Sequence, residues 1–231
     1  MTAASVRARV RAEMITEIKA IARRHLAVDG ANLSLRAVAR DLGMVSSAIY
    51  RYFPSRDELL TALIVDAYDA LGDAAERADA ENNRSDLLGR WLACCHGVRG
   101  WAVAQPHEYA LIYGSPVPGY RAPADTVVPA TRPVRVMAAI LADGVATGTL
   151  RSAPGDRLPR SVRDEFTVIR DAVAPGVPET ILARGVTAWI QLFGTVSFEV
   201  FGQFNNTVVD RQAFFDHQMR TMAVQMGLPA R

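Results

Sequence analysis

The sequence predicts an all-α protein, with a three-helix amino-terminal domain followed by a larger helical domain. Two patterns support this fold class. Apolar residues recur at steps of three and four along most segments, which is the spacing of one helical face. Between these segments lie glycines, prolines or polar clusters, and no segment shows the alternation of a half-buried strand. The chain has 231 residues, half of them hydrophobic, which is enough for a substantial core.

The first quarter of the chain contains three expected helices. The first covers residues 7–28, where apolar residues share one face. Ser34 can cap a short helix over residues 35–42, because its hydroxyl can accept from a free backbone N–H of the first turn. Gly43 ends that helix, and a second short helix over about residues 45–52 follows at once.

The longest expected helix runs from the Ser55 capping position to about residue 80. Ser55 and Glu58 form a capping box, in which each side chain satisfies a backbone N–H of the other. Polar or Pro- and Gly-rich segments separate the later helices, three of which have Ser85, Pro106 or Asp210 at their starts. We expect these later helices over residues 86–104, 106–113, 125–149, 161–173, 179–204 and 210–226.

The two short helices around Gly43 form a helix-turn-helix pattern. A turn of three or four residues needs glycine at this position because the backbone there usually takes a positive φ. The second short helix is polar on its outer face and aromatic at its end, so it can enter the major groove of DNA. Small and apolar residues are expected to pack the two helices together: Val38, Ala39, Leu42 and Ile49.

The segment from Leu33 to Leu60 resembles the amino-terminal domain of the tetracycline-repressor (TetR) family of transcription regulators. The motif residues are Gly43, the run Ile-Tyr-Arg-Tyr-Phe at 49–53 and the run Ser-Arg-Asp-Glu-Leu at 55–59. The resemblance implies a homodimer that binds double-stranded operator DNA. It also implies that the protein represses transcription and that a small, largely apolar effector releases it from the operator.

The resemblance also implies a division of labour along the chain. The helix-turn-helix DNA-binding domain would cover residues 1–56, and a helical effector-binding and dimerisation domain would cover residues 57–231. The net charge of +2 is distributed in keeping with this division, since residues 1–60 hold ten basic and six acidic residues. A basic amino-terminal quarter is typical of a domain that binds DNA phosphates.

Individual DNA contacts follow from the family pattern. Tyr50 would place its hydroxyl on a phosphate, and Arg56, where the family usually has lysine, would contact another. Ser34 would cap the second helix and donate to the DNA backbone, while Arg36 would reach a base. Val45 stands where the family commonly has serine, which predicts a weaker cap for the recognition helix. The remaining residues expected on the base-reading face are Ser46, Ser47, Ala48 and Tyr52.

The larger domain partly resembles a class of this family whose late helices carry a tryptophan–histidine–glycine signature. Trp189 matches it, whereas Phe193 and Gly194 stand where histidine and glycine are expected. Large side chains on the middle helices could line an effector pocket or form ordinary core. These pocket candidates are Trp91, Trp101, Tyr109, Tyr113, Met137, Trp189 and Phe193.

The last two helices are expected to form the dimer interface as a four-helix bundle with their symmetry mates. Apolar and small residues recur along each at steps of three and four, although such stripes could equally pack within one chain. The interface candidates are Gly194, Ser197 and Phe201 on one helix, and Phe215, Met219 and Met222 on the other.

Other function classes find less support in the sequence. The chain lacks the motifs G-x-S-x-G, P-loop and H-E-x-x-H, so we expect no enzyme, cofactor or metal. The adjacent Cys94 and Cys95 cannot form a disulfide framework, and neither a signal peptide nor a membrane span is expected, so a cytoplasmic location is favoured. The alternative is a dimeric DNA-binding regulator without a small-molecule effector, controlled by a protein partner or by thiol redox chemistry.

Overall fold

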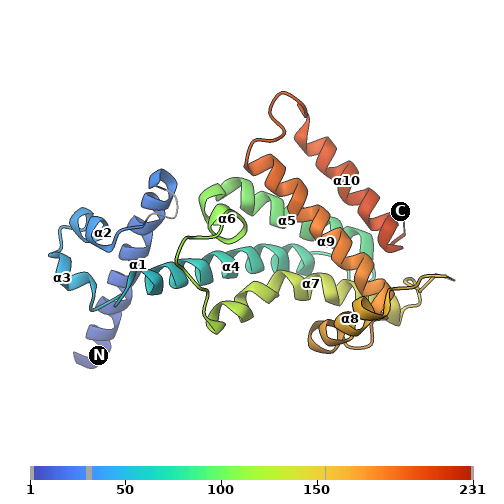
Figure 1. Cartoon of the computed structure of the whole chain (residues 1–231), viewed down its shortest axis with the longest axis horizontal. Coiled ribbons are helices and arrows are strands. Elements are labelled where there is room, and N and C mark those ends of the chain that lie inside the picture. The colour runs from blue at the N-terminus through green and yellow to red at the C-terminus, as the bar shows by residue number, and fades with distance from the viewer. Residues whose placement is uncertain (1–2, 30–32, 154, 230–231) are drawn as a thin grey trace. The chain divides into compact units, whose positions relative to one another are not determined.

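The computed structural model describes residues 3–29, 33–153 and 155–229, and all its regular elements there are helices (Figure 1). The predicted all-α class is confirmed. The helices are α1 Ala3–Asp29, α2 Leu35–Asp41, α3 Ser46–Ile49, α4 Arg56–Ala80, α5 Leu87–Ala104, α6 Pro106–Tyr113, the 3₁₀-helix η1 Ala124–Thr126, α7 Val127–Ala146, α8 Arg160–Val173, α9 Glu179–Val200 and α10 Arg211–Met226.

The chain packs as two compact units. The amino-terminal unit comprises Met1–Tyr68 and Gln105–Pro129, and the carboxy-terminal unit comprises Asp69–Ala104 and Ala130–Arg231. Helix α4 is continuous through the point where the first unit ends and the second begins. The boundary expected between residues 56 and 57 divides the chain by function, and it stays a prediction.

The core of the amino-terminal unit is built by α1, α2, α3 and the first turns of α4. Ile18, Val38, Ile49 and Leu59 are fully buried in it, so the two short helices are fixed on a common apolar base. Side chains of α6 and of the following loop pack against this core, among them Leu111, Val117 and Tyr120. The sequence had placed α6 with the larger domain, so its membership of this unit is a finding of the structure.

Ion pairs fasten α1 to its neighbours within the amino-terminal unit. Lys19 Nζ lies 2.8 Å and Arg23 Nη2 2.6 Å from the carboxylate of Asp66 on α4. Arg23 Nε also lies 3.1 Å from Glu108 on α6. These charged groups are only partly exposed, so pairing offsets the free-energy cost of removing each charge from water.

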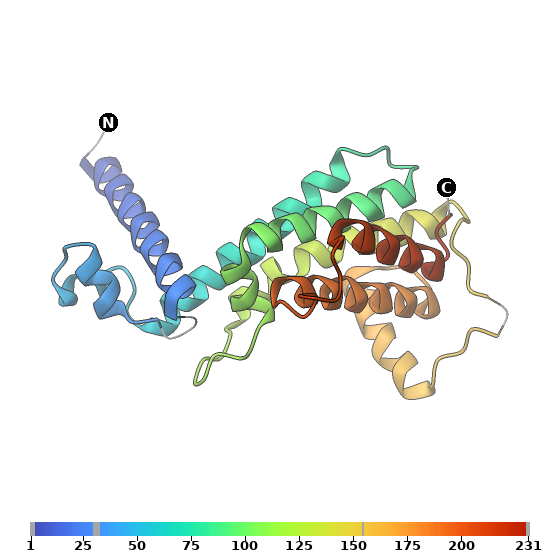
Figure 2. The same cartoon turned by 90° about the horizontal axis from the view of Figure 1, so that it is seen from above.

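The carboxy-terminal unit is a helical bundle in which α9 and α10 run side by side and antiparallel, with α5 packed against both (Figures 1 and 2). The buried Trp91 on α5 donates its indole N–H to the carbonyl oxygen of Met219 at 2.8 Å. Arg99 on α5 donates two hydrogen bonds of 2.7 Å to the carboxylate of Glu199 on α9. Such bidentate pairs fix orientation as well as distance.

Two arginines join α4, α5 and α7 in the same unit. Arg90 on α5 donates to Asp79 on α4 and to Asp143 on α7, each at 2.7 Å, and its side chain is only 5% exposed. Arg132 on α7 lies against three carboxylates of α4, contacting Asp69 at 2.9 Å and others one and two turns further along. The two carboxylates compensate the charge of the buried Arg90 guanidinium. Loss of either carboxylate would leave part of that buried charge uncompensated and would destabilise the fold.

Three details differ from the sequence expectation. Helix α3 ends at Ile49, because the backbone from Tyr50 onward forms tighter turn hydrogen bonds. Helix α9 ends at Val200 instead of residue 204. At the start of α5, Asp86 accepts from the N–H of Gly89 at 2.8 Å, while the Ser85 hydroxyl donates to a neighbouring asparagine.

Helix α9 is also apolar for its length. Among the described residues, Glu179–Val200 alone is long and apolar enough to span a bilayer, by length and composition. Its buried face packs on α5, α8 and α10. This packing is that of a core helix of a helical bundle.

The turn at Gly43 yields the first testable prediction. Gly43 has φ +68°, and a Cβ there would meet no atom within 4 Å, so a Gly43→Ala change introduces backbone strain without a clash. We expect the free energy of unfolding to fall by about 1 kcal/mol, because side chains disfavour the left-handed region.

Gly100, inside α5 and equally open, is the matched control for this measurement. Its backbone is helical, so Gly100→Ala should raise the free energy of unfolding by up to about 1 kcal/mol. Urea unfolding followed by circular dichroism measures both variants. Equal effects of the two substitutions would contradict a conformational requirement at Gly43.

Candidate DNA-binding surface

Helix α2 is positioned by a cap at its start and by apolar contacts beneath it. Ser34 has an extended backbone, and its hydroxyl oxygen accepts from the N–H of Ala37 at 3.4 Å. Leu35, Val38 and Ala39 are buried in the core of the amino-terminal unit. The opposite face, with Arg36 and Arg40, is exposed.

A short turn at Gly43 and Met44 connects α2 directly to α3. The N–H groups of Gly43 and Met44 donate to the carbonyl oxygens of Arg40 and Ala39, at 3.0 and 2.9 Å. These bonds satisfy the last carbonyls of α2, as in a Schellman-type helix end. Val45 then begins α3 without a side-chain cap, which confirms the weaker cap predicted for this position.

The expected base-reading residues lie on the outer side of α3 and just beyond it. Ser46 and Ser47 are exposed and Ala48 is half-buried, while Ile49 on the inner side is fully buried. Tyr52 is half-buried against the core, and the guanidinium of Arg11 on α1 lies 5.2 Å from the centre of its ring. A cation over an aromatic face is attractive, so Tyr52 is partly engaged within the unit.

Four of the eight predicted DNA-contact residues converge on one shallow depression. Its volume is about 350 Å³. It lies between the start of α2, the end of the α3 turn and the start of α4, and Tyr50 is 42% exposed at its edge. Hydroxyl and guanidinium donors gathered in this way suit a phosphate oxygen. The residues lining the depression are Leu33, Ser34, Leu35, Arg36, Tyr50 and Arg56.

Arg56 has a structural as well as a surface role. Its Nε donates to the carbonyl oxygen of Leu33 at 3.2 Å, which joins the start of α4 to the residue before the α2 cap. Nearby, His25 Nε2 on α1 lies 2.7 Å from the Asp41 carboxylate at the end of α2. This hydrogen bond, with a smaller contribution from Arg40, lowers the pKa of Asp41.

A second open groove adjoins the depression along α2 and the turn, and it holds Arg40, a residue that the sequence analysis missed. Arg36 and Arg40 are four residues apart, so they lie on one face of α2, and both line this groove with Ser46. The sequence signal that could have identified Arg40 is its spacing of four residues from Arg36 on the helix that precedes the predicted recognition helix. Both side chains are exposed.

The amino-terminal arginines lie on a helix in this structure. Arg7, Arg9 and Arg11 all belong to α1, which begins at Ala3. Arg9 forms an exposed ion pair with Glu13 at 3.5 Å.

The predicted effector-pocket residues fall in both units. In the amino-terminal unit, Tyr109 and Tyr113 stack with ring centres 5.2 Å apart, and burial raises the pKa of Tyr113. In the other unit, the rings of Trp189 and Phe193 are in tilted contact with centres 4.5 Å apart, and Trp91 donates a hydrogen bond to the carbonyl oxygen of Met219. Met137 is buried and Trp101 half-buried there. Their role as a pocket stays a prediction.

The predicted dimer-interface residues differ in exposure. On α9, Gly194 is exposed, Ser197 is half-buried and Phe201 is 42% exposed. On α10, the predicted stripe is covered within the chain itself, since Phe215 and Met219 are fully buried and Met222 is 8% exposed. The exposed apolar residues that the sequence analysis missed are Ile190 and Phe198 on α9 and Val224 on α10.

Cys94 and Cys95 lie in the core of the carboxy-terminal unit. Both are free thiols with almost no exposure. Burial, together with the charge of Asp79, raises the pKa of Cys94 to about 12, and burial raises the pKa of Cys95 well above its usual value. Since the thiolate is the reactive form, this environment opposes redox chemistry at either residue.

Comparisons with known proteins find matches along both parts of the chain. Residues 18–63 match the family described as bacterial regulatory proteins, tetR family. Residues 91–222 match the domain described as tetracyclin repressor-like, C-terminal domain. The more specific tryptophan–histidine–glycine class stays a prediction.

Curated relatives and solved structures extend the similarity over nearly the whole chain. The HTH-type transcriptional regulators Rv1816 of Mycobacterium tuberculosis and Mb1846 of Mycobacterium bovis are each 42% identical over 220 residues, which is 94% of this chain and 94% of theirs. The crystal structure of the protein SCO4313 has a TM-score of 0.76 at 34% identity, covering 93% of this chain and 97% of that one. RolR, crystallised with resorcinol, shares the fold, with a TM-score of 0.51 at 15% identity over 96% and 98%.

The buried thiols yield a second prediction. At pH 8 roughly one Cys94 thiol in ten thousand is ionised at a pKa of about 12, so DTNB should label neither cysteine in the folded protein. Both should react in denaturant. A Val209→Cys variant, at a position 98% exposed, is the control and should label rapidly when folded. Rapid labelling of the native thiols that also weakens DNA binding would support thiol control instead.

Proposed function

The chain belongs to the TetR family of bacterial transcription regulators, and from this premise we propose that it binds double-stranded operator DNA as a homodimer through α2 and α3. It is a helix-turn-helix regulator and not an enzyme. The observation that carries the proposal is the convergence of Ser34, Arg36, Tyr50 and Arg56 on one depression beside the recognition helix. An operator-binding protein acts where the chromosome lies, in the cytoplasm.

The proposed contacts divide between affinity and sequence choice. Tyr50, Arg56 and Ser34 would hold phosphate oxygens, which sets the register of the unit on the duplex. The outer side of α3 would face base edges in the major groove, with Ser46 and Ser47 as hydrogen-bonding groups and Ala48 as an apolar contact. Because α3 is short and begins without a side-chain cap, its first turn can adjust when DNA binds.

We further propose that a small, largely apolar effector ends repression. An effector acts only if it binds one of two states of the protein better than the other. If it prefers the state with low operator affinity, its binding lowers the affinity of the protein for the operator. The support is limited to aromatic pairs such as Trp189–Phe193 and to the shared fold of RolR, which was crystallised with resorcinol. A regulator controlled by a protein partner remains the alternative, while buried thiols disfavour redox control.

The DNA contacts are tested by two single substitutions. Tyr50→Phe should weaken binding about tenfold on every sequence, because it removes a hydroxyl proposed to donate to a phosphate. Arg36→Ala should weaken binding and lower the slope of log affinity against log salt by about one if Arg36 contacts a phosphate, or relax sequence preference if it contacts a base. Fluorescence anisotropy with an operator found by footprinting measures each.

Arg157→Ala is the matched control for Arg36→Ala. It removes the same charge from an exposed loop of the carboxy-terminal unit, so it should leave the affinity and the salt slope at their wild-type values. If Tyr50→Phe and Arg36→Ala both bind like wild type, the assigned contacts are wrong. Arg56→Ala is less direct, because it also removes the hydrogen bond to Leu33.

The effector proposal has its own measurement. A ligand that binds the folded protein raises its melting temperature with concentration. In a thermal-shift screen of small aromatic and aliphatic compounds, we expect at least one that raises the melting temperature and releases the operator in the anisotropy assay. A complete screen in which every stabilising compound leaves operator affinity unchanged would favour the regulator without a small-molecule effector.

A further inference from the structure

Arg40 is an exposed cation beside the recognition helix that none of the contacts proposed above uses. Its side chain is 78% exposed, and it lines the open groove along α2 together with Arg36 and Ser46. The groove has a volume of about 590 Å³ and lies at the start of α3, whereas the depression lined by Tyr50 lies at the end of that helix. Ser34 and Arg36 line both hollows. Arg40 therefore extends the same cationic surface past the start of the recognition helix.

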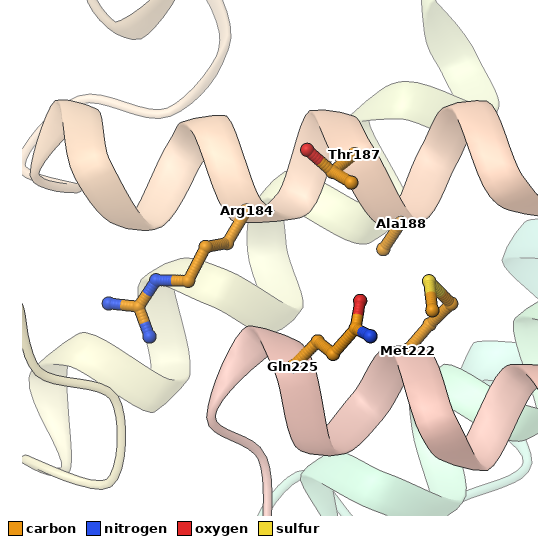
Figure 3. A pocket seen from close by; sticks show the side chains of 5 residues that line it. All are labelled: Arg184, Thr187, Ala188, Met222 and Gln225. Atoms are coloured by element: carbon orange, nitrogen blue, oxygen red, sulfur yellow. The ribbon is translucent and has the colours of Figure 1, made fainter. Parts of the chain in front are cut away.

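Arginines that hold the fold together are engaged quite differently. In the carboxy-terminal unit, Arg184 closes one end of a pocket of about 210 Å³ between α9 and α10 (Figure 3). Its guanidinium donates to the carbonyl oxygens of Met226 and Arg151 and pairs with the carboxylate of Asp156. A guanidinium with three such partners is committed to its own chain. The exposed guanidinium of Arg40 can instead bind an acceptor on another molecule.

The acidic neighbour of Arg40 is unexpected on such a surface. Asp41 is the one acidic residue of α2 and also its last residue, so its carboxylate lies at the negative end of the helix dipole. Next to Arg36 and Arg40, its negative charge would also weaken the attraction of the surface for phosphate. Both effects are unfavourable, so Asp41 needs a contact that compensates its charge.

His25 on α1 supplies that contact. Its Nε2 lies 2.7 Å from one carboxylate oxygen of Asp41, and because an ionised carboxylate can only accept, the imidazole donates. The other oxygen lies 3.6 Å from Nε of Arg40, which is beyond the usual hydrogen-bond range. The hydrogen bond from His25 is the largest of the causes that lower the pKa of Asp41. The carboxylate is thus held by α1 and not by its neighbour on α2.

We propose that Arg40 is a further phosphate contact of the candidate DNA-binding surface, and that His25 keeps it available by holding the carboxylate of Asp41. The proposal rests on the operator binding proposed above and adds a contact that the family pattern did not supply. Arg40 binds a phosphate beside the start of α3, while Tyr50 binds one beside its end. His25 is a positioning residue, because it acts on DNA only through Asp41.

Loss of the imidazole changes how the charges pair. Without His25, Arg40 is the cation next to the Asp41 carboxylate, and a small rotation of either side chain closes the present 3.6 Å separation. The resulting salt bridge uses the same guanidinium donors that a phosphate oxygen needs. Operator affinity then falls although every residue that touches the DNA is still present.

Substitution of Arg40 tests the phosphate contact. Arg40→Ala should lower operator affinity about five- to tenfold on every sequence and reduce the slope of log affinity against log salt by about one. Arg157→Ala, in an exposed loop of the carboxy-terminal unit, is the matched control and should leave both values unchanged. Fluorescence anisotropy over a salt series measures them. Wild-type affinity and salt slope for Arg40→Ala would overturn the contact.

Substitution of His25 tests the positioning role. His25→Ala should weaken operator binding about threefold or more, because Asp41 then competes for Arg40. Adding Asp41→Asn should restore the wild-type affinity, since the competing charge is gone while the link to α1 stays broken. His25→Gln retains an amide donor for Asp41 and should bind within about twofold of wild type. The control His107→Ala, at an exposed position on α6, should bind like wild type.

A purely structural role of His25 predicts a different pattern. If His25 served only to fasten α1 to α2, Asp41→Asn would not restore operator binding to His25→Ala, and that result would overturn the positioning role. In the Arg40→Ala background, His25→Ala should change affinity no further, because the contact it protects is already absent. Additive losses in the double variant would overturn the coupling. Urea unfolding of each variant sets the conditions under which all are folded.

The outcomes separate this inference from the proposed function. A wild-type chain that selects no DNA sequence would refute operator binding itself. A wild-type chain that binds operator, is weakened by Tyr50→Phe and is indifferent to Arg40→Ala would refute only the contact proposed here.

Discussion

The acidic residues of α4 are the constraint on which the packing of both units depends. Asp66 receives Lys19 and Arg23 from α1 in the amino-terminal unit. Further along, the helix receives Arg132 from α7 and Arg90 from α5 in the carboxy-terminal unit. Exposed ion pairs contribute little to stability, but the side chain of Arg90 is almost wholly buried, so its partners must be in place for that packing to persist.

The same helix begins at the candidate DNA-binding surface. Arg56, its first residue, donates to the carbonyl of Leu33, and Ser55 accepts from the N–H of Glu58 at 3.2 Å. The start of α4 is thus capped and joined to the start of α2. Ile49, the buried last residue of α3, fixes that helix on the same core.

Local chemistry made the amino-terminal unit predictable from the sequence. A glycine that takes a positive φ, a serine cap before α2 and a capping serine before α4 each act within a few residues, so their effects can be inferred without a structure. The absence of a cap at Val45 was predictable for the same reason. The predicted DNA-contact residues came from the family pattern, which did not include Arg40.

Long-range packing was not predictable in this way. Apolar periodicity shows that a helix face is covered but does not identify what covers it. Phe215 and Met219 were expected to face a second copy, yet their own chain buries them, while Ile190 and Phe198 on α9 stay exposed. Likewise, no local signal places α6 against the core of the amino-terminal unit, because the contact of Arg23 with Glu108 joins residues far apart in the sequence.

Selection of DNA from a random library by the purified chain, followed by footprinting of the selected sequence, tests the central claim most directly. The account predicts a pseudo-palindrome whose two half-sites are both protected by one dimer, in keeping with a two-fold protein on DNA. It also predicts that Tyr50→Phe protects the same sequence only at higher protein concentration. Recovery of no preferred sequence, or of a single half-site bound by a monomer, would contradict the account.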